Sequence, residues 1–208
     1  MIKNIVFDMG GVLIHYSSSS ILSHIPLSEE DEKLLMREMF HSLEWIQLDR
    51  GTISEQDAIA AICGRLPERL HKVVHQVITG WWEFDLNPME GMEELLSELK
   101  SLGCGIYLLS NATLRQPEYF DRIPGSQYFD GQVVSAQCRF LKPQTEIYET
   151  LFRDFSLKPE ECFFVDDLSI NIEGAYCRGM IGEVFDGDIQ RLRRALNRAG
   201  VPVRVGQN

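Results

Sequence analysis

The stretch that most constrains the fold is Ile5-Val6-Phe7-Asp8-Met9-Gly10-Gly11-Val12-Leu13. Apolar residues that favour strands lead directly into Asp8, and two glycines follow before the chain becomes apolar again. This pattern predicts a buried strand with a carboxylate at its carboxyl end and then a tight turn that needs glycine backbones. Ligands of open α/β sheets bind at the carboxyl ends of strands, so Asp8 is the first candidate for chemistry. The competing interpretation is a simple turn residue or helix cap.

Three later apolar stretches are also followed by polar residues, and we expect each stretch to be a strand. Ile106–Leu109 precedes Ser110-Asn111, Phe140-Leu141 precedes Lys142-Pro143, and Cys162–Val165 precedes Asp166-Asp167. Taken singly, a serine or asparagine could cap a turn and a lysine could be an exposed loop residue. Taken together with Asp8, they predict one site.

The second part of the chain alternates helices and strands, as a parallel sheet requires. Helices are predicted over 91–102, 146–155 and 170–178, with a short strand over 183–185 and a last helix from Ile189. The predicted fold is α/β, a Rossmann-like doubly wound parallel sheet made of residues 1–16 and 86–208.

Residues 17–85 have a different character and are predicted to form an inserted helical bundle. Ser28 is a plausible N-cap with acidic residues in the first turn, Ser54 opens a second helix and Pro67 a third. An apolar stripe follows Pro67 at helical spacing.

Charge and cysteine content limit the partners and the compartment. Lys and Arg number 20 and Asp and Glu 31, a net charge of −11, which argues against nucleic acid or an anionic membrane surface as a partner. An anionic substrate then needs local help from a metal, a lysine or helix N-termini. The five cysteines lack C-x-x-C spacing, no signal peptide is visible and no apolar run reaches the length of a membrane helix. We expect free thiols, a cytoplasmic location and a monomer or weak dimer.

The four polar groups that follow the apolar stretches resemble, in chain order, the four motifs of the haloacid dehalogenase superfamily of phosphatases and related hydrolases. They are Asp8, Ser110-Asn111, Lys142-Pro143 and Asp166-Asp167. The resemblance runs from Ile2 to about Phe185. It is nearest to small capped phosphatases of the α-glucose-1-phosphate phosphatase type. It implies that residues 17–85 are a cap over the active site, and Asp49-Arg50-Gly51-Thr52-Ile53-Ser54 resembles a phrase common in such caps.

The resemblance implies a role for each motif residue. Asp8 would attack phosphorus and form an aspartyl-phosphate, with Mg²⁺ bridging Asp8 and the phosphate. The predicted phosphate contacts are Ser110, the Asn111 backbone and Lys142, the metal ligands are Asp8, the Gly10 carbonyl and Asp167, and the residues behind them are Asp166 and Asn171.

One position departs from the pattern of the superfamily. Most such phosphatases carry a second aspartate two residues after the nucleophile, where it transfers protons; this chain has Gly10 there, as the glucose-phosphatase subgroup does. Its carbonyl can still bind a metal, but general acid–base help worth about 10²–10⁴ in rate is missing. Unless another group substitutes, we expect leaving groups that depart as anions, so that glucose 1-phosphate reacts faster than glucose 6-phosphate. His15 is a weak candidate for the proton.

The predicted substrate is a small phosphorylated metabolite, and residues of the insertion should select it. Aromatic and polar groups suit a sugar face, which makes His41, Glu44, Trp45, Trp81 and Trp82 candidates, although Trp81 also fits the core of the insertion.

Two alternatives stay open. A 2-haloacid dehalogenase also lacks the second aspartate but needs no metal, which leaves the Asp166-Asp167 pair without a purpose. A binding or regulatory protein with weakened turnover has only Gly10 in its favour.

Overall fold

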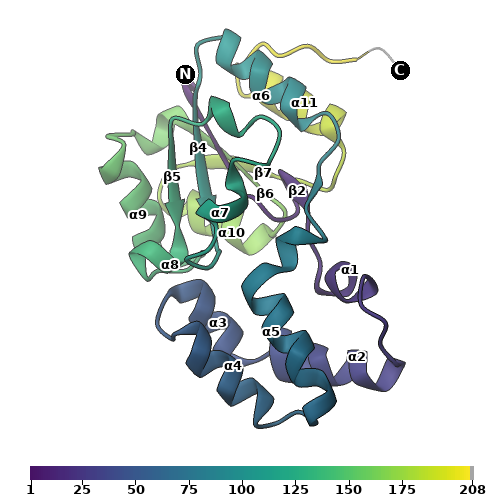
Figure 1. Ribbon diagram of the computed structural model, residues 1–208. Helices are drawn as coiled ribbons and strands as arrows, with labels where there is room; N and C mark the ends of the chain where they lie inside the picture. The colour runs from purple at the N-terminus through teal and green to yellow at the C-terminus, as the bar shows by residue number, and fades with distance from the viewer. Residues whose placement is uncertain (207–208) are drawn as a thin grey trace.

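The computed structural model describes residues 1–206 and has a five-stranded parallel sheet at its centre (Figure 1). The strands are β1 (Asn4–Phe7), β4 (Gly105–Ser110), β5 (Gly131–Val134), β6 (Cys162–Asp166) and β7 (Ile181–Val184). Their order is β5-β4-β1-β6-β7, so the chain builds one half of the sheet and then crosses β1 to build the other. Ligands of open α/β sheets bind where the strand order changes direction in this way. The predicted α/β fold class is confirmed.

The central strand is buried on both faces, which explains its unbroken apolar run. Ile5 and Phe7 belong to the core that also contains the apolar residues of α6 and α11, whereas Val6 belongs to the core beneath α9 and α10. Figure 1 shows these two helix pairs on opposite sides of the sheet. The helices of this part are α6 (Met92–Ser101), α7 (Pro117–Phe120), α8 (Ser135–Cys138), α9 (Thr145–Asp154), α10 (Ser169–Tyr176) and α11 (Ile189–Arg198).

Five α-helices lie between β2 (Ile14–His15) and β3 (Asn87–Pro88), a short antiparallel pair. They are α1 (Ser18–Ser23), α2 (Glu29–Leu35), α3 (Leu43–Arg50), α4 (Glu55–Cys63) and α5 (His71–Gly80), with a π-helical turn over Met36–Phe40 and 3₁₀ turns over Glu68–Leu70 and Trp81–Glu83. Figure 1 places α2 to α5 beyond the carboxyl ends of the strands. Within residues 1–206, no helix combines the length and the apolar character that crossing a membrane requires.

The sequence pattern predicts only three helices in this region. Ser28 and Ser54 do cap α2 and α4, each accepting a backbone hydrogen bond from the residue three positions on. Pro67 instead precedes a 3₁₀ turn, and α5 begins at His71. The helix that was missed beside the site is α3, which Ser42 caps by accepting from the Trp45 N–H at 3.2 Å.

The predicted strand before Lys142 is wrong. The strand in this part of the sheet is β5, which ends at Val134, and α8 follows it. Arg139 then has φ 66°, and Phe140 is 36 % exposed, so Phe140-Leu141 is a turning surface segment rather than a buried strand. Lys142 therefore reaches the site from a loop. The last strand, β7, also lies earlier than the predicted range 183–185.

Candidate active site

Asp8 lies at the carboxyl end of β1, between the two neighbouring strands. Its N–H donates to the Val165 carbonyl at 2.9 Å, which continues the ladder between β1 and β6 by one residue. Its Oδ1 accepts from the Met9 N–H at 2.7 Å and lies 2.9 Å from the Lys142 Nζ. The carboxylate is thus held in a fixed orientation with very little exposure to solvent.

Lys142 joins the first and last strand ends of the site. Its ammonium group is buried and contacts both Asp8 Oδ1 and, at 2.7 Å, Asp166 Oδ2. Its backbone is held by Asn111: the Lys142 N–H donates to Asn111 Oδ1 at 2.8 Å, and Asn111 Nδ2 donates to the Lys142 carbonyl at 3.2 Å. Asn111 follows β4, so a side chain at one strand end positions the loop that supplies the lysine.

The two adjacent aspartates have different surroundings. Both oxygens of the buried Asp166 accept hydrogen bonds, from Asn171 Nδ2 at 2.9 and 3.1 Å, from the Leu168 N–H at 2.8 Å and from Lys142. Asp167 is on the exposed side of the pair. Asp166 is therefore a fixed support for Lys142 and Asn171, and Asp167 faces the site.

Burial and like charges shift the pKa values of these groups. Burial raises the pKa of Asp8 to about 6, with Lys142 opposing the rise and Asp166 adding to it. Burial and the charge of Asp166 also raise the pKa of Asp167. Burial alone would lower the pKa of Lys142, but the charges of Asp8 and Asp166 outweigh it and keep the pKa above its ordinary value. One ammonium group faces three carboxylates, a balance that favours a further cation.

The donor set fits a hard divalent cation. Asp8, Asp166 and Asp167 each offer an oxygen, and these three atoms lie within 4.8 Å of one another. Carboxylate oxygens are the ligands that Mg²⁺ prefers. Because Asp166 already accepts several hydrogen bonds, Asp8 and Asp167 are the more available donors.

The two glycines after Asp8 differ in the space around them. Gly11 has φ +72°, and a Cβ there would lie 2.5 Å from Asp167 Oδ2, so a side chain would collide with a proposed ligand. Gly10 is outside the left-handed region, and a Cβ there would meet the Tyr16 Cβ at 3.4 Å. Tyr16 thus packs where a side chain at position 10 would begin.

Ser110 is the last residue of β4 and is 1 % exposed. Since β4 pairs with β1, Ser110 stands at the same edge of the sheet as Asp8. The structure therefore brings all the predicted site residues to one edge, with Asp8, Lys142, Asp166 and Asn171 joined by direct contacts.

A cavity of about 100 Å³ lies between this edge and the inserted helices. It is lined by Met9, Gly10, Ile14, Tyr16, Trp45, Leu48, Asp49, Ile78, Trp81, Asn111, Ala112, Thr113 and Tyr119. Most of these side chains are apolar or aromatic. No local pattern of the sequence predicts a role for Tyr16, Asp49 or Tyr119, because only the folded chain brings their segments together.

The predicted selectivity residues of the insertion divide into two groups. Trp45 and Trp81 line the cavity, so Trp81 contributes to its wall as well as to packing. Trp82 is buried against Tyr119, with ring centroids 5.0 Å apart.

The other candidates do not line the cavity. Glu44 is paired with Arg65 at 2.7 Å, and His41 is exposed. His15, the weak candidate for the proton, is exposed on β2 and lies outside the lining as well.

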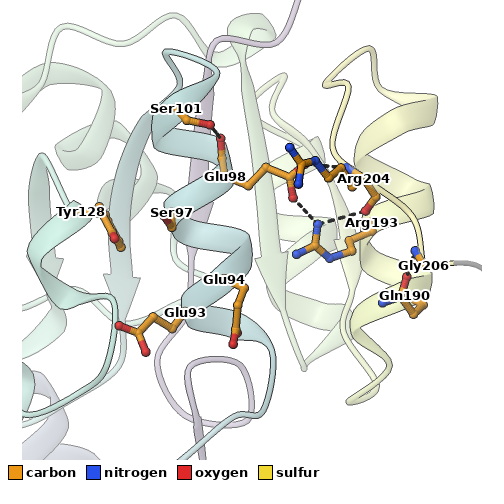
Figure 2. Close-up of a pocket in the computed structure, with 10 residues that line it drawn as sticks. All are labelled: Glu93, Glu94, Ser97, Glu98, Ser101, Tyr128, Gln190, Arg193, Arg204 and Gly206. Carbon is orange, nitrogen blue, oxygen red and sulfur yellow. Dashed lines mark hydrogen bonds and ion pairs between the residues drawn. The ribbon is translucent and has the colours of Figure 1, made fainter.

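A larger hollow of about 630 Å³ lies elsewhere, on the surface between α6 and α11 (Figure 2). Glu98 crosses it and joins Arg193 to the Arg204 N–H, so it anchors the C-terminal segment to the two helices. Its lining includes none of the carboxylates around Asp8, and the side chains of Glu98 and Arg193 serve this structural contact.

Comparisons with known proteins agree with this geometry. The chain is 29% identical over 187 residues to a sesquiterpene phosphatase of Aspergillus oryzae, covering 86% of this chain and 88% of the relative. It is 30% identical over 184 residues to a D-ribitol-5-phosphate phosphatase of Bacteroides thetaiotaomicron, covering 83% and 86%. A haloacid dehalogenase family enzyme of Bacteroides thetaiotaomicron, solved in complex with magnesium and inorganic phosphate, has the same fold with a TM-score of 0.71, 22% identity and coverage of 92% and 99%. Residues 2–175 match the family of haloacid dehalogenase-like hydrolases, and the chain belongs to that family.

Proposed function

We propose that the chain is a magnesium-dependent phosphatase that hydrolyses a small phosphate monoester through an aspartyl-phosphate on Asp8. The observation that carries this proposal is a buried Asp8 in contact with Lys142 and within 4.8 Å of two further carboxylates. That is a nucleophile, a cationic phosphate partner and a cation site at one strand edge. Two relatives named as phosphatases support the same activity.

Each residue of the site has its own role in the proposed reaction. Asp8 is oriented by the Met9 N–H and Lys142 for attack on phosphorus. Lys142 offsets charge on the phosphoryl group, and Ser110 and the backbone of Asn111 bind its oxygens. The carboxylate of Asp166 keeps Lys142 charged, and Asn171 keeps Asp166 in place.

Asp8, Asp167 and the Gly10 carbonyl would hold the metal. A bound Mg²⁺ neutralises charge on the phosphoryl oxygens, which otherwise repel a carboxylate nucleophile. Residues 17–85 would act as the cap, and the cavity beneath them would hold the leaving group. Aromatic faces and one carboxyl suit a sugar phosphate, including an anomeric ester. The cavity volume limits the size of the leaving group.

The test is phosphate release from sugar, polyol, aryl, acyl, prenyl and nucleotide phosphates, with magnesium and with a chelator. Asp8→Asn keeps the shape but removes the nucleophile, so release should fall by about 10³-fold or more. Asp154→Asn, an exposed residue of α9, is the matched control and should keep full activity. Halide release from a 2-haloacid without magnesium, and no phosphate release from any ester, would instead identify a dehalogenase.

A further inference from the structure

The proposed reaction needs a proton for the leaving oxygen, and the Asp8 turn does not supply one. Position 10 is a glycine, and Tyr16 packs against the place where its side chain would start. A donor must therefore come from another wall of the cavity. The wall opposite the strand edge is formed by the inserted helices.

Asp49, in the last turn of α3, is the one carboxylic acid among the residues that line the cavity. Its neighbours there are apolar or aromatic, including Trp45, Leu48 and Trp81. Within residues 1–206, its carboxyl group forms no hydrogen bond or ion pair. By contrast Glu44, on the same helix, is held by Arg65. The carboxyl group of Asp49 therefore does not stabilise the fold through a polar contact.

The backbone of Asp49 is fixed to the loop that binds phosphate. The Ser135 hydroxyl donates to the Asp49 carbonyl at 2.5 Å and accepts from the Ala112 N–H at 2.9 Å. Ala112 follows Ser110-Asn111 directly. One hydroxyl thus connects the end of α3 to the strand end that would hold the phosphoryl group.

Gly51, two residues after Asp49, also holds the end of α3 close to the sheet edge. Gly51 ends α3 with φ +69°, and a Cβ there would lie 2.2 Å from the Ala136 carbonyl. The end of the helix can approach α8 this closely only because position 51 is a glycine. The structure therefore sets Asp49 against the sheet edge by two independent contacts.

We propose that Asp49 is the general acid–base of the phosphatase reaction, replacing the carboxyl group absent at position 10. The inference rests on the proposed function. As Asp8 bonds to phosphorus and the ester P–O bond breaks, its electron pair passes to the leaving oxygen, which takes the proton of the Asp49 carboxyl. Water then attacks phosphorus, the Asp49 carboxylate takes a proton from that water, and the bond to Asp8 breaks, which releases phosphate.

The electrostatics of the cavity suit this role. Burial raises the pKa of Asp49 to about 7, near the value that best serves proton transfer at neutral pH. Tyr16 and Tyr119 are the other titratable side chains of the lining, and burial together with the charge of Asp49 raises the pKa of each above its ordinary value, so both are poor donors. Neither α4 nor α8, which pack against α3, places a residue in the lining.

The experiment compares benzyl phosphate with 4-nitrophenyl phosphate, whose rings are of similar size but whose oxygens differ in their need for a proton. Asp49→Asn should lower kcat/KM for benzyl phosphate by about 10²–10⁴-fold and change kcat/KM for 4-nitrophenyl phosphate much less, because kcat/KM covers only the steps up to departure of the alcohol. In the unchanged enzyme, kcat/KM for benzyl phosphate should fall as pH rises through about 7, because Asp49 must start protonated. That falling limb should be absent in Asp49→Asn.

Two controls keep the test decisive. Asp57→Asn makes the same change in α4, outside the cavity, and should leave the difference between the two esters unchanged. The stability advantage of Asp49→Asn over the unchanged protein should grow as pH rises from the ordinary pKa of 3.8 to the raised pKa of about 7 and stay constant above it, because over that range the carboxyl is ionised in the unfolded chain and protonated in the folded one. Equal losses in kcat/KM on both esters, or none on either, would overturn the role of Asp49. Lack of magnesium-dependent release from 4-nitrophenyl phosphate by the unchanged enzyme would instead overturn the phosphatase proposal.

Discussion

At the scale of single residues, the turn after Asp8 shows how much chemistry a missing side chain can control. Gly11 leaves room for the carboxylate of Asp167, whereas Gly10 lies against Tyr16. Gly11 leaves the proposed metal site unobstructed, and Gly10 leaves the turn without a proton donor. Adjacent, identical residues therefore have opposite consequences for the reaction.

Gly11→Ala should weaken magnesium binding in addition to its cost in stability. The left-handed backbone costs an alanine about 1–2 kcal/mol, and its Cβ would also displace Asp167. Gly103→Ala is the matched control, since Gly103 has φ +81° with no atom within 4 Å of the added Cβ. Titration of phosphate release with magnesium should show a higher half-saturating concentration for Gly11→Ala alone. Equal curves for the two variants would show that Gly11 does not act through Asp167.

At the scale of elements, α3 is the helix that completes the site. The sheet supplies Asp8, Ser110 and the aspartate pair, and a loop supplies Lys142, so all of these residues lie on the sheet side of the proposed site. The contacts of α3 with Ser135 and with the Ala136 carbonyl bring Trp45, Leu48 and Asp49 over the other side. The cavity exists because this helix end is fixed to the core.

Ser135→Ala should loosen that helix end. It removes the hydroxyl that joins Asp49 to Ala112 and leaves the Ala112 N–H without this partner, which should lower the free energy of unfolding by about 1–3 kcal/mol. The measurement is urea denaturation together with KM. Ser101→Ala, which removes an exposed hydroxyl bond to the Glu98 carbonyl, should have a much smaller effect. An unchanged KM in Ser135→Ala would show that the Ser135 hydroxyl does not hold α3 in position over the cavity.

At the scale of the whole molecule, charge and domain contacts act together. The net charge of −11 repels an anionic ester, yet Lys142 and a bound cation would give the site itself a favourable local charge. The inserted helices are joined to the segment between β4 and β5 by Arg115 with Glu55, at 2.5 and 2.8 Å, and by Arg122 with Glu83 at 2.7 Å. Partly exposed pairs of this kind are weak, so the attachment of the insertion depends more on buried aromatic contacts, such as those of Trp81 and Trp82 with Tyr119.

Magnesium should raise the thermal stability of the protein. A cation that binds only the folded chain at 100 times its dissociation constant adds about 2.7 kcal/mol, and it relieves the repulsion among Asp8, Asp166 and Asp167. Thermal unfolding with magnesium and with a chelator measures the shift. Asp167→Asn should abolish it, whereas Asp154→Asn should retain it. A shift of the same size in both variants would place the cation elsewhere.

The local pattern of the sequence was enough to predict the strand before Asp8, the parallel sheet and the residues of the strand-end site. Those predictions depend on short-range rules: apolar runs bury strands, and parallel strands end at one edge. The apolar pair Phe140-Leu141 favours a strand by its local pattern but lies in a loop, and the strand that does form, β5, is short and begins at a glycine.

The sequence by itself determined that Asp8, Ser110 and the aspartate pair follow strands, and parallel strands end at one edge of the sheet, so these groups meet there. Only the tertiary structure decided what faces that edge. Tyr16 fills the space beside Gly10, Asn111 holds the Lys142 loop, and Ser135 brings Asp49 over the cavity. These contacts join segments that are far apart in the chain, and no local spacing encodes them. They depend on packing between the insertion and the core, which exists only once both have folded.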